Sequence, residues 1–168
     1  DDVIALEPKS PLGNLVSYGE DDELDVNNLD EFDFSKADIA VFATSEEIGK
    51  RYLPKAAAKG IKIVDCSGAT FADTDVPMII AGINDAAVHE AKKRIVSVPS
   101  ALTTQMLLPL GKVNEKFSVK RLIASAYIST SVYGKEAMDE LFNQTRKIYM
   151  NTTLADDEQV FKKQIAFN

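Results

Sequence analysis

The chain has 168 residues, of which 45% are hydrophobic and 27% are charged, the usual composition of a soluble globular protein. Its formal net charge of −7 disfavours nucleic acid or an anionic membrane as the main partner. We find neither an apolar run of membrane-spanning length nor a signal-peptide pattern, and therefore expect a cytoplasmic protein.

The first part of the chain combines one short apolar run with an acidic segment. Residues 3–6 predict a short buried strand, and because a domain rarely opens on a core strand, we expect further sequence ahead of it. Residues 20–33 contain eight acidic residues and no basic one, which indicates a solvated surface loop or a short edge hairpin. The spacing and central glycine of a calcium loop are absent from this run.

The next segment has the pattern of a strand, a helix and a second strand. Residues 38–44 are a continuous apolar run, typical of a parallel strand buried on both faces. Ser45 is suited to cap a helix with an acidic first turn, which we expect to end at Gly60 and to be kinked by Pro54. Residues 61–65 form the next strand, so the pattern predicts a parallel sheet in an α/β fold.

Residues 66–77 follow that strand as a loop at its carboxyl end, where α/β sheets bind their ligands. The pattern then predicts a strand at 78–81, a short helix to about residue 92 capped by Asn84 or Asp85, a strand at 95–98 and a helix at 101–116. From residue 119 the pattern changes, with a long strand at 120–131 and an amphipathic helix at 134–149. We interpret this change as the start of a second domain.

Four stretches of the chain form recognisable motifs: VDCSGA at 64–69, DVPMII at 75–80, VPSALTTQ at 98–105 and GKEAMDEL at 134–141. Together with the ending QIAFN, they resemble the aspartate-semialdehyde dehydrogenase family. Because these motifs occur in the family's order along the whole chain, together they are more specific than any one of them. Family members convert aspartyl phosphate to aspartate semialdehyde with NADPH, through a cysteine thiolate that is both a good nucleophile and a good leaving group.

The resemblance implies a domain organisation for the chain. Residues 1–100 would form part of a Rossmann-like NAD(P)-binding domain, whose N-terminal strand and glycine turn are absent from the chain. Residues 101–168 would form a linking helix and the first part of an α+β dimerisation domain. The expected assembly is a homodimer.

Three positions depart from the family's catalytic pattern. The family's nucleophile segment reads Asn-Pro-Asn-Cys-Ser-Thr, and the resemblance places Ala101 at its cysteine, next to Ser100. The glutamine that orients the acyl group falls on Ile128, and the arginine that helps to bind phosphate falls on Phe71. An alanine methyl cannot attack a carbonyl, so the family reaction is not expected. The pattern resembles the Usg protein branch of the family, which lacks the catalytic cysteine.

The resemblance also identifies where NADP would bind. The implied contact positions are Lys9, Ser10, Ala43, Thr44, Ser67 and Gly68. Glu46 replaces a family glycine and brings bulk and negative charge to the loop that would approach the cofactor. We therefore expect NADP binding to be possible but weakened.

Two other side chains offer alternative chemistry. Cys66 sits in the loop after a strand and is a conceivable substitute nucleophile, although a buried or half-buried inert thiol is the simpler interpretation because no basic residue adjoins it. Ser100 would need a paired base, and His89 is expected to face solvent. Since the chain has one cysteine and one histidine, it has no internal disulfide and no metal site made of several such ligands, and we expect no metal.

Three functions stay open. The leading hypothesis is a non-catalytic or diverged homologue that retains a cleft for a dinucleotide or another small molecule and a dimer interface. The second is an NADP-dependent oxidoreductase of amino-acid biosynthesis that acts on a small aldehyde bearing a carboxylate. The third is a structural or interaction subunit without a ligand. Saturable binding of NADP(H) would separate the third from the other two.

Overall fold

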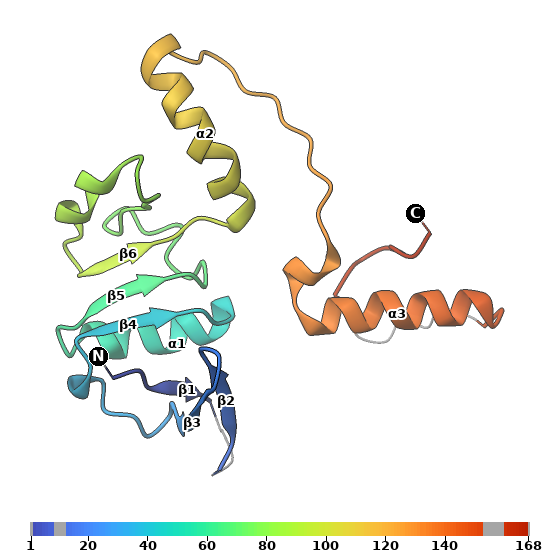
Figure 1. The fold of residues 1–168 in the computed structure, drawn as a ribbon, viewed down its shortest axis with the longest axis horizontal. Helices are drawn as coiled ribbons and strands as arrows, with labels where there is room; N and C mark the ends of the chain where they lie inside the picture. Colours follow the sequence, from blue (N-terminus) through green and yellow to red (C-terminus); the bar gives the residue numbers. More distant parts are fainter. Residues whose placement is uncertain (1, 9–12, 153–159, 168) are drawn as a thin grey trace. The chain divides into compact units, whose positions relative to one another are not determined.

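The computed structural model describes residues 2–8, 13–152 and 160–167. The chain divides into two compact units, Asp1–Val119 and Lys120–Asn168. Figure 1 shows a layered sheet-and-helix arrangement in the first unit and a helix accompanied by a return segment in the second. The expected boundary at residues 100 and 101 between a nucleotide-binding and a dimerisation domain stays a prediction.

The first unit contains two three-stranded sheets. One has the order β1-β3-β2, in which β1 (Ala5–Glu7) runs parallel to β3 (Asp22–Asn28) and β2 (Leu15–Tyr18) runs antiparallel to it. The strand expected at residues 3–6 thus lies slightly later and is half-buried. The acidic segment supplies the second strand of the β2–β3 hairpin, in which β2 lies at the edge of the sheet and β3 lies at its centre.

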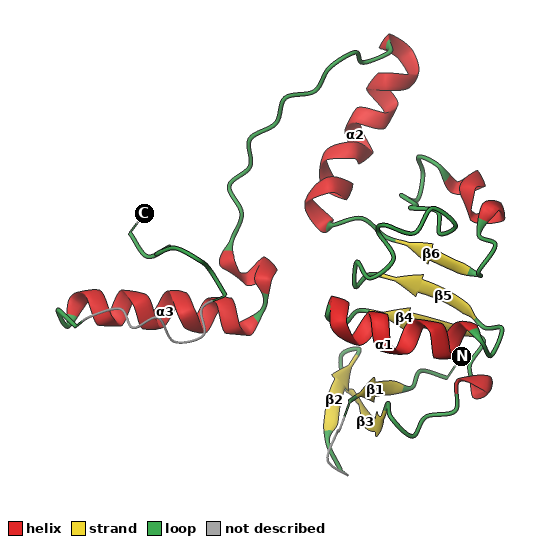
Figure 2. Ribbon diagram, turned by 180° about the vertical axis from the view of Figure 1, so that it is seen from behind, coloured by secondary structure: helices red, strands yellow, loops and turns green. Residues whose placement is uncertain are grey.

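The second sheet is fully parallel and has the order β4-β5-β6. Its strands are β4 (Ile39–Phe42), β5 (Lys62–Asp65) and β6 (Ile95–Ser97). Val41 lies opposite Val64, and Val64 lies opposite Val96, so the three strands end at the same edge (Figure 2). The predicted parallel α/β sheet is confirmed.

Helix α1 (Glu46–Ala57) connects β4 to β5 as the sequence predicts. The Ser45 hydroxyl accepts a hydrogen bond from the Ile48 amide at 3.4 Å, which caps the helix. Beyond the helix, Gly60 adopts a φ of 75° before β5 begins, a left-handed conformation that suits glycine after a helix.

A hydrophobic core joins α1 to the sheets. Tyr52, Leu53 and Ala56 of the helix pack in one cluster with Ile63 and Ile95 of the parallel sheet, and further members are Leu29, Phe34, Phe42, Ile61 and Val76. The strand β4 is not buried on both faces as expected, because Ile39 is 58% and Val41 64% exposed. Only the other face of β4, which carries Phe42, contributes to this core.

The long connection between β5 and β6 differs from the prediction. No strand forms at residues 78–81, where Met78 makes only an isolated bridge to Ser97. The reason is the side chain of Asn84, which donates to the Met78 carbonyl and accepts from the Ile80 amide, so these backbone groups are not available for a ladder. The following helix is a short 3₁₀ segment, η2 (Asp85–Glu90), and Asn84 does not cap it. Its His89 is exposed, as expected.

Helix α2 (Ala101–Phe117) follows β6 and confirms the predicted helix. In the second unit, the strand expected at 120–131 is absent, because no neighbouring strand offers these residues hydrogen bonds in the described part of the chain. A 3₁₀ segment, η3 (Thr130–Tyr133), then leads into α3 (Lys135–Tyr149), which confirms the predicted amphipathic helix. No helix within the described ranges is both long and apolar enough to span a bilayer.

Polar side chains of α3 hold the return segment of the second unit. The buried Gln144 side chain accepts hydrogen bonds from the amides of Ile165 and Ala166, at 2.9 and 3.2 Å. Glu140 accepts from the amides of Val160 and Phe161, at 2.7 and 3.2 Å. These side chains substitute for the backbone partners that a sheet would provide.

Candidate functional site

The candidate site lies at the carboxyl edge of the β4-β5-β6 sheet. Three loops meet there because the strands are parallel, and helices α1 and α2 both begin there. Backbone hydrogen bonds tie the loops together: the Cys66 amide donates to the Phe42 carbonyl at 3.1 Å, and the Val98 amide donates to the Asp65 carbonyl at 2.8 Å. This arrangement is the usual ligand-binding position of an open α/β sheet.

Asp65, the last residue of β5, organises the middle loop. Its side chain is fully buried. One carboxylate oxygen accepts from the Ser67 amide at 2.8 Å and the Ser67 hydroxyl at 2.5 Å, and the other accepts from the Thr70 amide at 3.0 Å and the Thr70 hydroxyl at 2.6 Å. Burial raises the pKa of Asp65, but these hydrogen bonds outweigh it and hold the pKa below its usual value. The carboxylate is therefore ionised at neutral pH.

Sequence reasoning did not identify Asp65 as a site residue. The available signal was its spacing, since an aspartate two residues before a serine in a loop favours a turn in which the carboxylate accepts from the backbone. The partner at Thr70 lies five residues away, beyond the reach of that local pattern.

Helix α1 approaches the middle loop closely. A Cβ atom on Gly49 would lie 2.9 Å from the Cβ of Ala69 and would also collide with the Ser67 side chain. Gly68 adopts a φ of 82°, and a Cβ there would lie 3.3 Å from the Phe71 ring. Two glycines thus permit the close packing and the backbone turn at this edge.

The predicted cofactor positions lie in these loops, apart from two. Ala43 and Thr44 follow β4, and the Thr44 hydroxyl donates to the Ser45 carbonyl at 3.2 Å. Ser67 and Gly68 are half-buried in the middle loop. Lys9 and Ser10 lie outside the described residues.

The position that the resemblance assigns to the family's nucleophile is at the start of α2. Ala101 is its first residue and is exposed. The Ser100 hydroxyl accepts from the Thr103 amide at 3.3 Å and lies 3.0 Å from the Thr103 hydroxyl. Ser100 therefore acts as the helix cap.

Cys66 follows Asp65 and is exposed, so the expectation of a buried or half-buried thiol is wrong, because its side chain lies in the loop beyond the buried end of β5. Desolvation by the loop and the charge of Asp65 raise the pKa of its thiol, so the thiol is protonated at neutral pH. That shift supports the interpretation of an inert thiol, because the thiolate is the reactive form.

The other two positions that the resemblance assigns to the family's catalytic pattern belong to different units. Phe71 is 53% exposed and lies in the middle loop, whereas Ile128 is 45% exposed and belongs to the second unit. Within the described ranges, no three His, Cys, Asp or Glu side chains gather closely enough to hold a metal ion.

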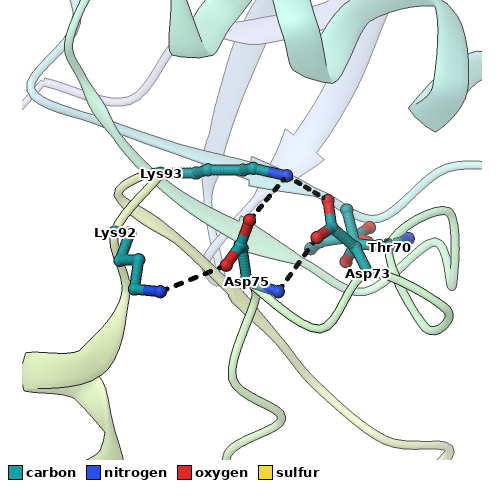
Figure 3. A network of polar contacts seen from close by, with 6 residues as sticks. Thr70, Asp73, Asp75, Lys92 and Lys93 are labelled. Atoms are coloured by element: carbon teal, nitrogen blue, oxygen red, sulfur yellow. Dashed lines mark hydrogen bonds and ion pairs between the residues drawn. The ribbon is translucent and has the colours of Figure 1, made fainter.

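A cleft of about 680 Å³ lies beside α1, and its lining residues include Leu53, Pro54 and Ile95. Lys93 on its rim pairs with Asp73 at 2.6 Å and with Asp75 at 3.8 Å. Figure 3 shows these side chains together with Lys92, which pairs with Asp75 at 3.3 Å.

The family model described as semialdehyde dehydrogenase, NAD binding domain, matches residues 8–91. The chain is 33% identical over 167 residues to aspartate-semialdehyde dehydrogenase of Rickettsia bellii, covering 99% of this chain and 48% of that protein. It is 35% identical over 158 residues to the enzyme of the same name from Legionella pneumophila, covering 94% of this chain and 45% of that protein. The chain thus spans about half the length of these relatives.

Solved structures agree with the sequence comparison. The structure of aspartate semialdehyde dehydrogenase II complexed with ASA from Vibrio cholerae matches with a TM-score of 0.87 and 29% identity, covering 100% of this chain and 49% of that one. A probable aspartate-semialdehyde dehydrogenase from Pseudomonas aeruginosa matches with a TM-score of 0.83 and 26% identity, over 98% and 48% of the two chains. The first unit contains a Rossmann-like, NAD-binding type of α/β domain, and the chain belongs to the semialdehyde dehydrogenase family as a homologue of aspartate-semialdehyde dehydrogenase.

Proposed function

We propose that this chain is part of a diverged homologue, of the Usg type, that binds NADP(H) at the carboxyl edge of the β4-β5-β6 sheet and does not carry out the family reaction. The observation that carries the proposal is Ala101 at the first position of α2. The positive end of a helix dipole stabilises a thiolate at such a position. Alanine offers no group for that effect to activate.

The neighbouring side chains do not replace the missing thiol. The raised pKa of Cys66 keeps its sulfur protonated. The Ser100 hydroxyl is engaged with the amide and the hydroxyl of Thr103, and a serine nucleophile requires a base to remove its proton. An acyl-enzyme intermediate therefore has no good attachment point at this edge.

The loops fit a nucleotide cofactor in part. Gly68 leaves the middle loop without a side chain at its turn, and Thr44 places a hydroxyl at the end of β4. Glu46 and Glu47 bring negative charge to the first turn of α1, where a phosphate group would otherwise be favoured. Lys50 pairs with Glu46 at 2.5 Å and offsets part of that charge. When bound, the cofactor would supply hydride transfer, and we expect its affinity to be lower than in a competent dehydrogenase.

A second candidate is aspartate-semialdehyde dehydrogenase activity carried by other residues. It is favoured by the names of the relatives, since both are aspartate-semialdehyde dehydrogenases, and by the solved structure that holds ASA.

The deciding experiment uses the full-length protein. We would measure NADPH binding by calorimetry and phosphate-dependent reduction of NADP with aspartate semialdehyde, for the wild type, Ala101→Cys and the matched control Ala101→Ser. We expect saturable NADPH binding by all three proteins and no turnover by the wild type or Ala101→Ser. Turnover by the wild type would establish the second candidate. Absence of NADPH binding would instead favour a structural subunit.

We further propose that the protein forms a homodimer. Support comes from the second unit, which exposes large apolar side chains at Ile123, Tyr127 and Val132, a pattern typical of interfaces. Light scattering of the full-length protein should give twice the monomer mass, and a monomer mass at micromolar concentration would contradict the proposal.

A further inference from the structure

Two different sets of interactions hold the segment that follows β5, residues 66–75: hydrogen bonds to Asp65 at its start and ion pairs at its end. At its start, the buried Asp65 carboxylate binds Ser67 and Thr70 through hydrogen bonds of 2.5–3.0 Å. Farther along, Asp73 and Asp75 form ion pairs with the lysines that precede β6. Figure 3 shows the second of these, with Lys93 directed toward Asp73 and Asp75 and with Thr70 beside Asp73.

The hydrogen bonds at Asp65 and its neighbours link all three loops of the candidate site. The Ser67 hydroxyl, which donates to Asp65, also accepts from the Ala69 amide at 3.2 Å. The Asp65 carbonyl accepts from the Val98 amide, two residues ahead of the Ser100 cap of α2. The next residue, Cys66, donates its amide to the end of β4. A shift at Asp65 would therefore move the loops after β4, β5 and β6 together.

The ion pairs of Asp73 and Asp75 lie on the surface. The Lys93 and Asp73 side chains are 45% and 34% exposed, and those of Lys92 and Asp75 are 79% and 47% exposed. Exposed ion pairs are screened by salt and contribute little to stability. Asp73 and Asp75 lie in the same loop as Ser67 and Thr70 but farther from the end of β5, and the two lysines precede β6.

We propose that Asp65 is a positioning residue for the nucleotide: its carboxylate holds residues 67–70 in the shape that receives the cofactor, whereas the ion pairs at Asp73 and Asp75 do not affect binding. This inference rests on the proposed NADP(H) function of the same edge. It assigns the shape of the edge to one buried carboxylate and the four hydrogen bonds that it accepts.

The substitution Asp65→Asn replaces one carboxylate oxygen with an NH₂ group, which cannot accept from a backbone amide. Either the Ser67 amide or the Thr70 amide then loses its partner, and the turn must rearrange. Thr70→Val removes one hydroxyl donor at nearly constant shape, while Thr70→Ser keeps that donor. The pair of Thr70 variants separates the hydrogen bond from the bulk of the side chain.

The test is calorimetric titration of the full-length protein with NADPH at low and high salt, with thermal unfolding recorded for each variant. We expect Asp65→Asn to weaken binding by about ten-fold or more, since an unpaired buried donor has a cost of that order. Thr70→Val should weaken it several-fold, and Thr70→Ser should restore the wild-type affinity. The matched control Lys93→Met, at the other end of the loop, should bind as the wild type does at both salt concentrations.

The outcomes distinguish this inference from the proposed function. Wild-type affinity in both Asp65→Asn and Thr70→Val would overturn the positioning role and leave the proposed function intact. An equal loss in Thr70→Ser or in Lys93→Met would also overturn it, because binding would then depend on the general stability of the loop. Absence of binding by the wild type would overturn the proposed function and the positioning role with it. If Asp65→Asn does not fold, the comparison of the two Thr70 variants decides.

Discussion

Different interactions stabilise the interior of each of the two units. The first unit has a continuous hydrophobic core in which α1 packs on β5 and β6. In the described part of the second unit, Ala137 and Ala166 are the buried apolar residues, and the buried Gln144 binds backbone amides of the return segment. The contrast teaches that hydrophobic burial stabilises the first unit, whereas side-chain hydrogen bonds to backbone amides and the aromatic pairs Tyr133–Phe161 and Tyr149–Phe167 hold the described part of the second.

The largest effect is expected in the core of the first unit. Ile63 is 1% exposed in β5, and Ile63→Ala should lower the free energy of unfolding by about 2–5 kcal/mol, through lost burial and a cavity. Urea denaturation of the full-length protein measures this change. The matched control is Ile39→Ala on the neighbouring β4, where the side chain is 58% exposed. Equal losses for both variants would contradict the assignment of the core.

The next effect concerns the buried carboxylate of the first unit. Asp65→Asn should lower the free energy of unfolding by about 1.5–3 kcal/mol at neutral pH, because charge-assisted hydrogen bonds are lost. The pKa of Asp65 is lower in the folded protein than its usual value. Its stabilising contribution is therefore present above the unfolded pKa of about 3.9 and is lost as the pH falls through the folded pKa. The difference in stability between the wild type and Asp65→Asn should accordingly begin to shrink below the unfolded pKa of about 3.9 and disappear only below the lower folded pKa, and a constant difference would refute the assignment.

A smaller effect is expected in the second unit. Gln144→Ala leaves the amides of Ile165 and Ala166 without their acceptor, and should cost about 1–2 kcal/mol. Hydrogen exchange at these two amides should accelerate, while exchange in β5 stays unchanged. Gln105→Ala, at an exposed position of α2, serves as the control. Unchanged exchange at Ile165 and Ala166 would show that Gln144 does not hold this segment.

The smallest effect is expected at the surface ion pairs of the first unit. Lys93 donates a hydrogen bond to the Asp73 carboxylate, and this bond raises the pKa of the lysine. The pair is nevertheless exposed to solvent, so salt screens its attraction. Lys93→Met should therefore reduce thermal stability only slightly at low salt and not measurably at high salt. A reduction that persists at high salt would mean that the lysine stem, through its packing, is the stabilising part.

The elements that the sequence predicted correctly are those with local signals. The capped helix after β4 follows from Ser45 and its acidic first turn, and the parallel strands follow from continuous apolar runs. The strands expected at 78–81 and 120–131 were wrong because a strand needs a partner, which an apolar pattern does not specify. In the first case the side chain of Asn84 binds the backbone instead.

The candidate site was predictable to a similar extent. The position of the loops at the carboxyl edge follows from the parallel sheet, whereas the replacement of the family's cysteine by Ala101 stays a prediction from the motif around it. The role of Gln144 was not predictable, since its partners lie 21 and 22 residues away along the chain. The shared position of Asp65 among three loops likewise depends on contacts between strands.

The close contact at Gly49 restricts which amino acids can replace this residue. Because any side chain there meets the loop of Ser67 and Ala69, the position should tolerate glycine alone in a saturation library, even though alanine favours a helix by about 1 kcal/mol. A Cβ atom on Gly60 would meet nothing within 4 Å, and the φ of Gly60 is 75°, so asparagine should survive there. The residue at position 49 of a distant relative should therefore indicate whether the helix that corresponds to α1 still packs against this loop.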